Sequence, residues 1–226
     1  MPGPQIQPIC GSVIRLTALD RCGVPIDGPA SQLVSECFAV VNFSPAYDEG
    51  EAKQRKNAAG KFCLNKPACP TLESVGIGLE LTGVDSAVRE LLVAGRTITT
   101  GPDITGGTFS EDVACDKFVA LEVWSELEQT CDATGQPQYV HWLLPLVGYW
   151  QLQDFSIEDA ATFFSFNGTS SGPTFDVDAG PPVTQIAGLP DPFYTETWGF
   201  VDGEHLLYNC TTTAPPADTG GLVAYP

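Results

Sequence analysis

Turn-forming residues recur along the whole chain and separate short runs of β-branched and aromatic residues. The 226 residues include 23 glycines and 19 prolines, a composition that favours many short strands over long helices. Strand-like segments are found at 12–19, 34–43, 74–84, 117–128, 139–148, twice within 149–172, and at 193–200. Because the pattern contains no βαβ alternation, we expect a mainly β fold, an antiparallel β-sandwich or barrel.

One segment has the periodicity of a helix. Residues 85–94 place Val88, Leu91 and Leu92 on one face, and Asp85 is positioned to cap the first turn. A helix of this length needs a packing partner, because isolated helices shorter than about 12–15 residues are marginal in water. The sequence therefore predicts one α-helix that flanks the sheet.

The two ends of the chain are poor in packing potential. Prolines at three of the first eight positions deny residues 1–11 regular strand hydrogen bonds, so we expect an N-terminal arm there. The threonine-, proline- and glycine-rich residues 210–226 are expected to form a C-terminal arm or tail. Residues 12–209 then form one β domain, a size that can bury a full core.

Positive charge is concentrated in one polar loop. The chain carries 10 basic and 28 acidic residues, a formal net charge of −18, yet half of the basic residues lie in the loop at about 43–67: Lys53, Arg55, Lys56, Lys61 and Lys66. Asn57 and Gly60 stand where this loop could return as an extended hairpin. An acidic body with a basic projection can contact a copy of itself head to tail, which generates rings or filaments. The alternative is a solvated loop with no partner.

The eight cysteines do not by themselves indicate whether the protein works in a reducing or an oxidising compartment. The first residues have neither the basic start nor the apolar core of a secretory signal, which favours reduced thiols. We expect most of the cysteines to be small buried apolar residues. Cys63 and Cys69 are the most plausible pair if a disulfide forms. No C-x-x-C spacing is present, which argues against a zinc site, and we expect no cofactor.

Two catalytic patterns occur, and both have simpler interpretations. Residues 168–172 match G-x-S-x-G around Ser170, with Asp191 and His205 following in hydrolase order. That motif needs a helix after the serine, and Pro173 disfavours one, so a polar turn is the better interpretation. Glu122 and Glu126 could be imagined as a glycosidase acid–base pair, but a chain this acidic produces such pairs by chance.

Residues 139–173, YVHWLLPLVGYWQLQDFSIEDAATFFSFNGTSSGP, carry a family resemblance. An aromatic, proline-containing strand followed by W-x-L-x-D-F-x-I-E and a polar G-T-S turn resembles the major tail tube proteins of long-tailed bacteriophages, especially those that infect actinobacteria. The segment 50–65, GEAKQRKNAAGKFCLN, is similar to the long loop of that family. With the helix segment, the resemblance covers most of residues 12–172.

The resemblance implies a non-enzymatic structural protein of the virion, assembled in the host cytoplasm without a membrane. Its subunits would form hexameric rings stacked into a tube, with tape measure, tail terminator and distal tail proteins as partners. The loop residues Lys53, Arg55, Lys56, Asn57 and Lys61 would contact the neighbouring ring. DNA would pass through the lumen without specific binding, as the acidic composition favours.

The strand at 117–128 supplies the candidates for the lumen. Val119, Leu121 and Val123 share one face of this strand, and Glu122, Trp124 and Glu126 share the other. We expect the first face to be core. Glu122 and Glu126 are candidates to face the channel, and the alternative is that they face outer solvent.

Two other functions remain open from the sequence. One is a secreted, disulfide-bonded acidic β-sandwich that binds or hydrolyses carbohydrate. The other is a tail terminator or baseplate ring protein of related fold. Counting the free thiols of the denatured protein would distinguish the secreted sandwich, whose cysteines would be paired, from a tube subunit. Copy number in the virion would distinguish a terminator or baseplate protein from a tube subunit, which should be among the most abundant proteins.

Overall fold

The computed structural model describes residues 8–21, 23, 25–56, 58–83, 86–100, 103–110, 115–131, 137–155, 164–170 and 204–224. Its main sheet has eight antiparallel strands in the order β2-β1-β9-β10-β11-β6-β3, with β12 also paired to β10. Their bounds are β1 Pro8–Leu19, β2 Gln32–Ser35, β3 Phe38–Asp48, β6 Thr71–Leu81, β9 Phe118–Cys131, β10 Pro137–Leu152, β11 Phe164–Ser170 and β12 Leu207–Thr211. The predicted mainly β fold with antiparallel, sandwich-like packing is confirmed.

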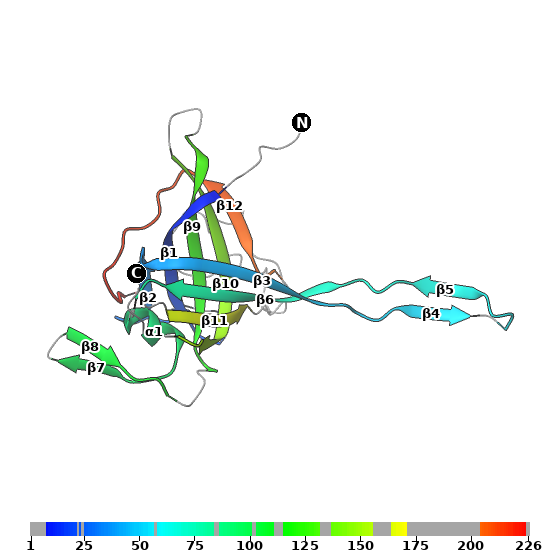
Figure 1. The fold of residues 1–226 in the computed structure, drawn as a ribbon, viewed down its shortest axis with the longest axis horizontal. Coiled ribbons are helices and arrows are strands. Elements are labelled where there is room, and N and C mark those ends of the chain that lie inside the picture. The colour runs from blue at the N-terminus through cyan, green and yellow to red at the C-terminus, as the bar shows by residue number, and fades with distance from the viewer. Residues whose placement is uncertain are drawn as a thin grey trace.

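The long strand β10 joins the two layers of the sandwich. Its first part pairs with β9 and β12, and its last part pairs with β11. The register with β9 shifts between Leu144 and Val147, around Pro145, as expected for a proline within a strand. A second shift on the β11 side encloses Tyr149, whose φ is 56°. These irregularities bend β10 so that β3, β6 and β11 cross β1, β9 and β10 in Figure 1.

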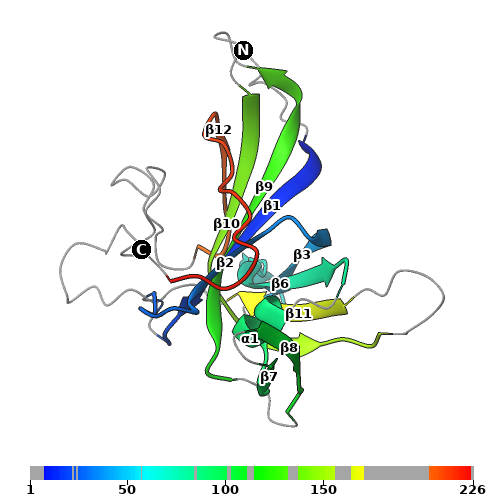
Figure 2. The same cartoon turned by 90° about the vertical axis from the view of Figure 1, so that its left-hand side faces the viewer.

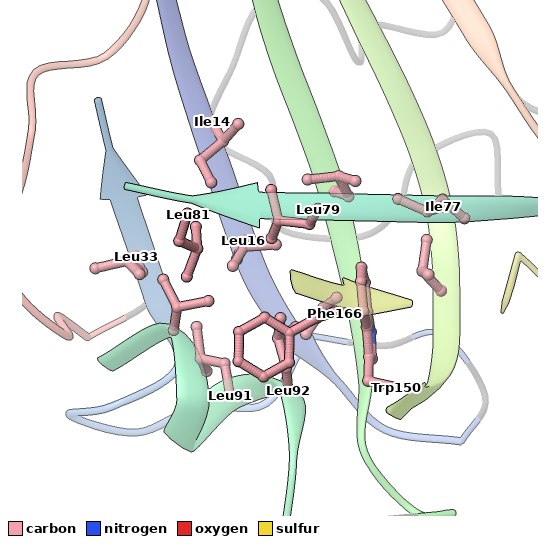
Figure 3. Packing of buried hydrophobic residues seen from close by; sticks show 14 of the residues in the cluster. Ile14, Leu16, Leu33, Ile77, Leu79, Leu81, Leu91, Leu92, Trp150 and Phe166 are labelled. Atoms are coloured by element: carbon pink, nitrogen blue, oxygen red, sulfur yellow. The ribbon is translucent and has the colours of Figure 1, made fainter. Parts of the chain in front are cut away.

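The core lies between the crossed layers. Side chains that alternate along β6 point inward and meet those of β1 and β9, as Figure 3 shows for Leu79, Leu16 and their neighbours. Trp150 and Phe166 fill the end of the core near β11, and both are almost fully buried. The face of Val119, Leu121 and Val123 belongs to this core, as predicted.

The predicted helix is confirmed as α1 (Ser86–Leu92). Val88 and Leu92 are fully buried, and Leu91 is nearly so, which places the expected face on the core. Figure 2 shows α1 at the lower end of β1, β9 and β10. A short hairpin that the sequence analysis did not predict follows it, formed by β7 (Thr97–Thr100) and β8 (Asp103–Gly107). Arg89 of α1 holds this hairpin by donating to the Thr108 carbonyl at 2.9 Å.

Several predicted boundaries differ from the structure. The strand expected at 34–43 is two strands, β2 and β3, and β3 extends to Asp48. The end of the expected N-terminal arm is already strand, because β1 begins at Pro8 and pairs there with Leu127. The strand expected at 193–200, and the connection between the two strands expected within 149–172, lie outside the described residues.

The C-terminal residues 212–224 are a clearer correction. We expected a tail with little packing, but this segment runs along β2 of its own body. Val223 forms a bridge with Gln32, and Thr219 hydrogen-bonds to Val34 through both its backbone and its hydroxyl group. The segment has few apolar side chains, and it is held mainly by backbone hydrogen bonds that sequence patterns do not reveal.

Candidate assembly surfaces

The basic loop is an extended hairpin that projects from the body. The β3–β6 pairing continues outward to Asp48 and Thr71. Beyond it, β4 (Lys53–Lys56) pairs with β5 (Phe62–Lys66), and the chain turns near Gly60, whose φ of 77° suits glycine. Figure 1 shows this hairpin extending away from the rest of the molecule, and the β7–β8 hairpin lies at the opposite end. The extended hairpin that the sequence suggested is confirmed.

The hairpin has no buried part beyond its base. Every residue from 44 to 73 whose exposure is described is exposed, including Lys53, Arg55, Lys56 and Lys61. The fifth predicted contact residue, Asn57, lies outside the described residues. A two-stranded ribbon in water is at best marginally stable by itself. The described side chains of this hairpin are therefore in solvent and do not pack on the core of the body.

Charge is segregated along the hairpin. Asp48, Glu49 and Glu51 lie near the body, whereas residues 53–66 contain five basic residues and no acidic one. We call residues 53–66 the basic tip. Within it Lys53 lies directly opposite Lys66, a like-charge pair that destabilises a ladder unless anions approach. Because the remainder of the chain has a formal charge of 5 − 28 = −23, the matching anions are plentiful on another copy.

The tip also carries an exposed aromatic ring. Phe62 is 54% exposed, and the Lys56 ammonium lies 4.7 Å from the centre of its ring. Such a cation–π contact contributes about 0.5–1 kcal/mol at an exposed site and keeps the ring and the charge together. The tip thus offers one compact unit of apolar area and positive charge.

The edges of the main sheet at β2 and β3 differ, and β12, which pairs with β10, forms a further short edge. The edge at β2 is covered by the C-terminal segment, where Val223 both donates to and accepts from Gln32. The edge at β3 is eleven residues long, and among the described strands β3 pairs only with β6. An open edge of this length is a template for a strand from another chain.

A groove with aromatic walls lies where the hairpin leaves the body. Its volume is 560 Å³, and its lining residues are Phe43, Pro45, Tyr47, Leu72, Val75, Glu204, His205, Leu206, Leu207 and Tyr208. Tyr47 and Tyr208 on its rim are about 60% exposed. Trp142 supports the wall, with its ring centre 6.0 Å from Phe43 and 5.6 Å from Tyr208. We call this the base groove.

The sequence analysis did not single out the base groove. Its walls come from β3, the start of β6 and the segment that leads into β12, which are far apart in the chain. The only local signal was the presence of aromatic residues within polar surroundings, at Phe43, Tyr47 and Tyr208. Such residues are found equally in cores, so the pattern by itself does not predict a surface groove.

The expectation for Glu122 is wrong. Its side chain is 0% exposed, and both of its carboxylate oxygens are bound by Arg15, through Nε and, at 2.7 Å, through Nη2. His141 Nε2 lies 3.0 Å from the same carboxylate. The face of β9 that was expected to carry carboxylates into solvent is therefore buried at this point, and Glu122 faces neither a channel nor a substrate.

The other candidate on this strand, Glu126, is exposed and lies opposite Cys10 on β1 and Tyr139 on β10. It remains available to line a lumen. A glycosidase pair of Glu122 and Glu126 is not supported, because the first carboxylate is buried in an ion pair.

The buried ion pair controls the charge of Glu122. Burial by itself raises the pKa of this carboxyl group, but the Arg15 charge and the hydrogen bonds from His141 and Arg15 outweigh it, and the pKa falls to about 2. Trp124 stacks on His141 with ring centres 4.5 Å apart, and the Arg15 guanidinium lies 5.3 Å from the Trp124 ring centre. The cluster joins β1, β9 and β10 by charge as well as by backbone pairing.

The polar turn expected at the G-x-S-x-G pattern is wrong, because Gly168, Thr169 and Ser170 belong to strand β11, where Ser170 contacts a histidine. Ser170 Oγ lies 2.9 Å from His205 Nδ1, and it also accepts a hydrogen bond from the Val75 amide at 2.8 Å. Ser170 is only 2% exposed and is not among the residues that line the base groove, so its hydroxyl group is covered within the described part of the chain, while His205 does line the groove. Close packing explains the glycine at position 168, because a Cβ there would lie 2.7 Å from the Trp150 ring. The contacts of these residues link β11, β6 and the segment before β12.

The cysteine expectations need correction. Cys37, Cys63, Cys69, Cys115 and Cys210 are all free and exposed, so the described thiols are neither buried apolar residues nor paired. Cys63 lies on the basic tip, and Cys69 lies between β5 and β6, next to Gly50. A sandwich stabilised by four disulfides is not supported by these five residues.

No family model matches the chain, and no curated protein matches it. Within the described ranges, no three or more histidine, cysteine, aspartate or glutamate side chains are grouped so as to hold a metal ion. The helix that the structure describes is seven residues long and cannot cross a bilayer. The features that the described residues offer for function are thus the basic hairpin, the open β3 edge and the base groove.

Proposed function

We propose that this chain is a structural subunit that assembles with copies of itself into hexameric rings stacked as the tail tube of a long-tailed bacteriophage. The observation that carries the proposal is the basic hairpin. It extends from the body with its described side chains in solvent, and it bears five of the ten basic residues on an otherwise acidic chain. A projection of this kind suits contact with the next copy along an axis.

The open edge of β3 supports contacts within a ring. Alternate residues along this eleven-residue strand direct their backbone groups away from β6, where another chain can pair with them, while the edge at β2 is covered by the C-terminal segment. Pairing of the β3 edge with a different surface of the next copy is a head-to-tail contact, and such a contact can repeat around an axis. Each hydrogen bond formed there contributes about 0.5–1.5 kcal/mol.

The charges on the hairpin and the body would fix how neighbouring subunits align more than they would strengthen binding between them. Exposed ion pairs contribute only about 0–1 kcal/mol each, so cohesion must come from strand pairing and apolar burial. The acidic body suits a conduit for DNA, because carboxylates repel phosphates and prevent binding to the wall. Tape measure, terminator and distal tail proteins would be the other partners of such a tube.

Negative-stain microscopy of the purified protein, with sedimentation across a concentration and salt series, tests the proposal. We expect rings of six subunits and tubes made of stacked rings. Rings that never stack would instead favour a terminator or baseplate ring protein. A protein that stays monomeric at millimolar concentration in both low and high salt would refute self-assembly.

A further inference from the structure

We infer that the base groove of one copy binds the basic tip of a second copy. This inference rests on the proposed function and adds the identity of the two surfaces that meet. The groove is an aromatic site that the other described segments leave open, and the tip is an exposed aromatic and basic segment with no acidic residue of its own. Three features of the structure make them complementary.

The first feature is charge. Glu204 lines the base groove. Asp48, Glu49 and Glu51 are exposed on the hairpin between the groove and the basic tip, and with Glu204 they give this end of the hairpin an acidic rim. The tip contributes five positive charges, which include the opposed pair Lys53 and Lys66. Contact with the acidic rim relieves that repulsion and fixes the direction of docking.

The second feature is aromatic matching. The groove walls of Phe43, Tyr47 and Tyr208 present ring faces and edges, and Trp142 holds two of these rings in place from below. Phe62 and the Lys56 ammonium above it form a unit that suits such walls, by ring packing and by cation–π contact. A volume of 560 Å³ is within the range of about 300–1,000 Å³ typical of binding clefts.

The third feature is distance. Residues 48–56 span about 30 Å at roughly 3.3 Å per residue. The base groove lies at the start of the hairpin and the tip at its end, so a second copy displaced by about this length in the same orientation brings its groove to the tip. The contact is heterologous, and repeating it generates an open stack rather than a closed dimer.

A site-specific crosslink tests the contact. The tip has a natural exposed thiol, Cys63, and Tyr208→Cys places a second thiol on the rim of the groove. We expect mild oxidation of assembled Tyr208→Cys protein to give a ladder of covalent dimers, trimers and longer chains in non-reducing gels. Mass spectrometry should find the tip peptide joined to the peptide that carries the substitution.

Two matched controls isolate the pair. Adding Cys63→Ser should abolish the ladder, while crosslinks from the other thiols stay unchanged. Ile98→Cys, on the exposed β7–β8 hairpin at the opposite end of the molecule, should give no ladder with Cys63. Tubes or stacked rings whose Tyr208→Cys form gives no Cys63-dependent ladder would overturn the inference and leave the proposed function intact.

A second pair of variants measures the aromatic contribution without new thiols. Phe62→Ala removes the ring from the tip, and Phe109→Ala removes a ring of similar exposure, 43% against 54%, from a loop elsewhere. We expect Phe62→Ala to raise the concentration needed for stacking by about tenfold or more, as expected for a lost aromatic burial. Phe109→Ala should not change it. Equal effects of the two variants would overturn the inference, whereas a wild-type protein that never assembles would refute the proposed function itself.

Discussion

The body of this chain buries two arginines, Arg15 and Arg89, whereas the hairpin exposes its basic residues to solvent. Arg15 lies inside the body, bound by two hydrogen bonds to Glu122 and stacked near Trp124. Arg55 and its lysine neighbours lie on an exposed two-stranded ribbon that contains no acidic residue. The buried charge of Arg15 therefore serves the stability of one subunit. Charge on the hairpin adds little to that stability and is available for contact between subunits.

Aromatic residues show the same division. Phe166 and Trp150 are almost completely buried between the layers of the sandwich. Phe62, Tyr47 and Tyr208 are more than half exposed, along the hairpin and at its base. Burial of a large apolar side chain contributes about 1.5–3 kcal/mol, so the exposed rings forgo a stabilisation that only a partner can supply. Substitutions in the two regions should therefore affect different measurements.

The largest effect on stability is expected from the core of the body. Phe166→Ala removes a ring that is 1% exposed and leaves a cavity, so the free energy of unfolding should fall by about 3–5 kcal/mol. Phe62→Ala on the hairpin is the matched control and should change it by no more than about 1 kcal/mol, the contribution of its contact with Lys56. Urea denaturation monitored by circular dichroism measures both. Similar losses would mean that the hairpin belongs to the folding unit of the body.

The next effect concerns the buried charge. Glu122→Gln leaves the Arg15 guanidinium buried without a counter-charge and should cost about 3 kcal/mol, whereas the exposed Glu126→Gln on the same strand should cost little. Denaturation at pH 7 compares the two variants. If the Glu126 variant proves the more destabilised, the ion pair is not what holds β1 to β9.

The same carboxyl group predicts a dependence on pH. Its pKa is about 2 in the folded protein and about 4.5 in the unfolded chain, so the unfolded state binds a proton first as pH falls. The stabilisation, roughly 3 kcal/mol, is complete above about pH 4.5 and is lost between there and about pH 2. Unfolding curves at pH 7, 4.5 and 3 should show this loss in wild type and a weaker loss in Glu122→Gln. Identical slopes would contradict the role of Glu122.

A smaller effect is expected at the covered edge. Thr219→Val removes the hydroxyl group that donates to the Val34 carbonyl or the Gly221 carbonyl and accepts from the Val34 amide. We expect a loss of about 1 kcal/mol and faster hydrogen exchange along β2. Thr212→Val, at an exposed position of the same segment, is the control. Unchanged exchange in the Thr219 variant would show that the C-terminal segment does not close this edge.

The smallest effect on stability should accompany the largest effect on assembly. Reversing Lys53, Arg55 and Lys56 to glutamate should change the free energy of unfolding by less than about 0.5 kcal/mol, because the three side chains are exposed. Stacking should be impaired, because the tip then repels the acidic body of the next copy. Circular dichroism and negative-stain microscopy measure the two results. If this variant formed normal tubes, the positive charge of the hairpin would not be needed for stacking.

Much of the fold was predictable because it follows from local patterns. The alternation along β9, the apolar face of α1 and the polar hairpin with its turn near Gly60 were each visible within about twenty residues. The β7–β8 hairpin was missed because its threonine- and glycine-rich strands have no buried face to create an alternating pattern. The division of 34–43 into two strands was missed because both pieces have strand composition.

The site was less predictable, because its parts are distant in the chain. The basic tip could be recognised from charge alone, since electrostatic concentration is a property of composition. The base groove combines residues between 43 and 75 with residues 204–208, so no single segment of the sequence contains its pattern. The contact between Ser170 and His205 involves two residues of a hydrolase-like motif. The burial of Ser170 and its hydrogen bond from the Val75 amide show that the contact holds β11, β6 and the segment before β12 together.

The sequence by itself determined that this chain is an acidic β protein with one short helix and a basic projection, because periodicity, turn residues and net charge are local or additive properties. Only the tertiary structure decided where Glu122 lies. Its partners Arg15 and His141 are 107 and 19 residues away, and the strand pairings β1–β9 and β9–β10 bring them to one place. Which edge of the sheet is covered and which stays open depends in the same way on long-range pairing, because a strand's backbone groups are identical in every sequence.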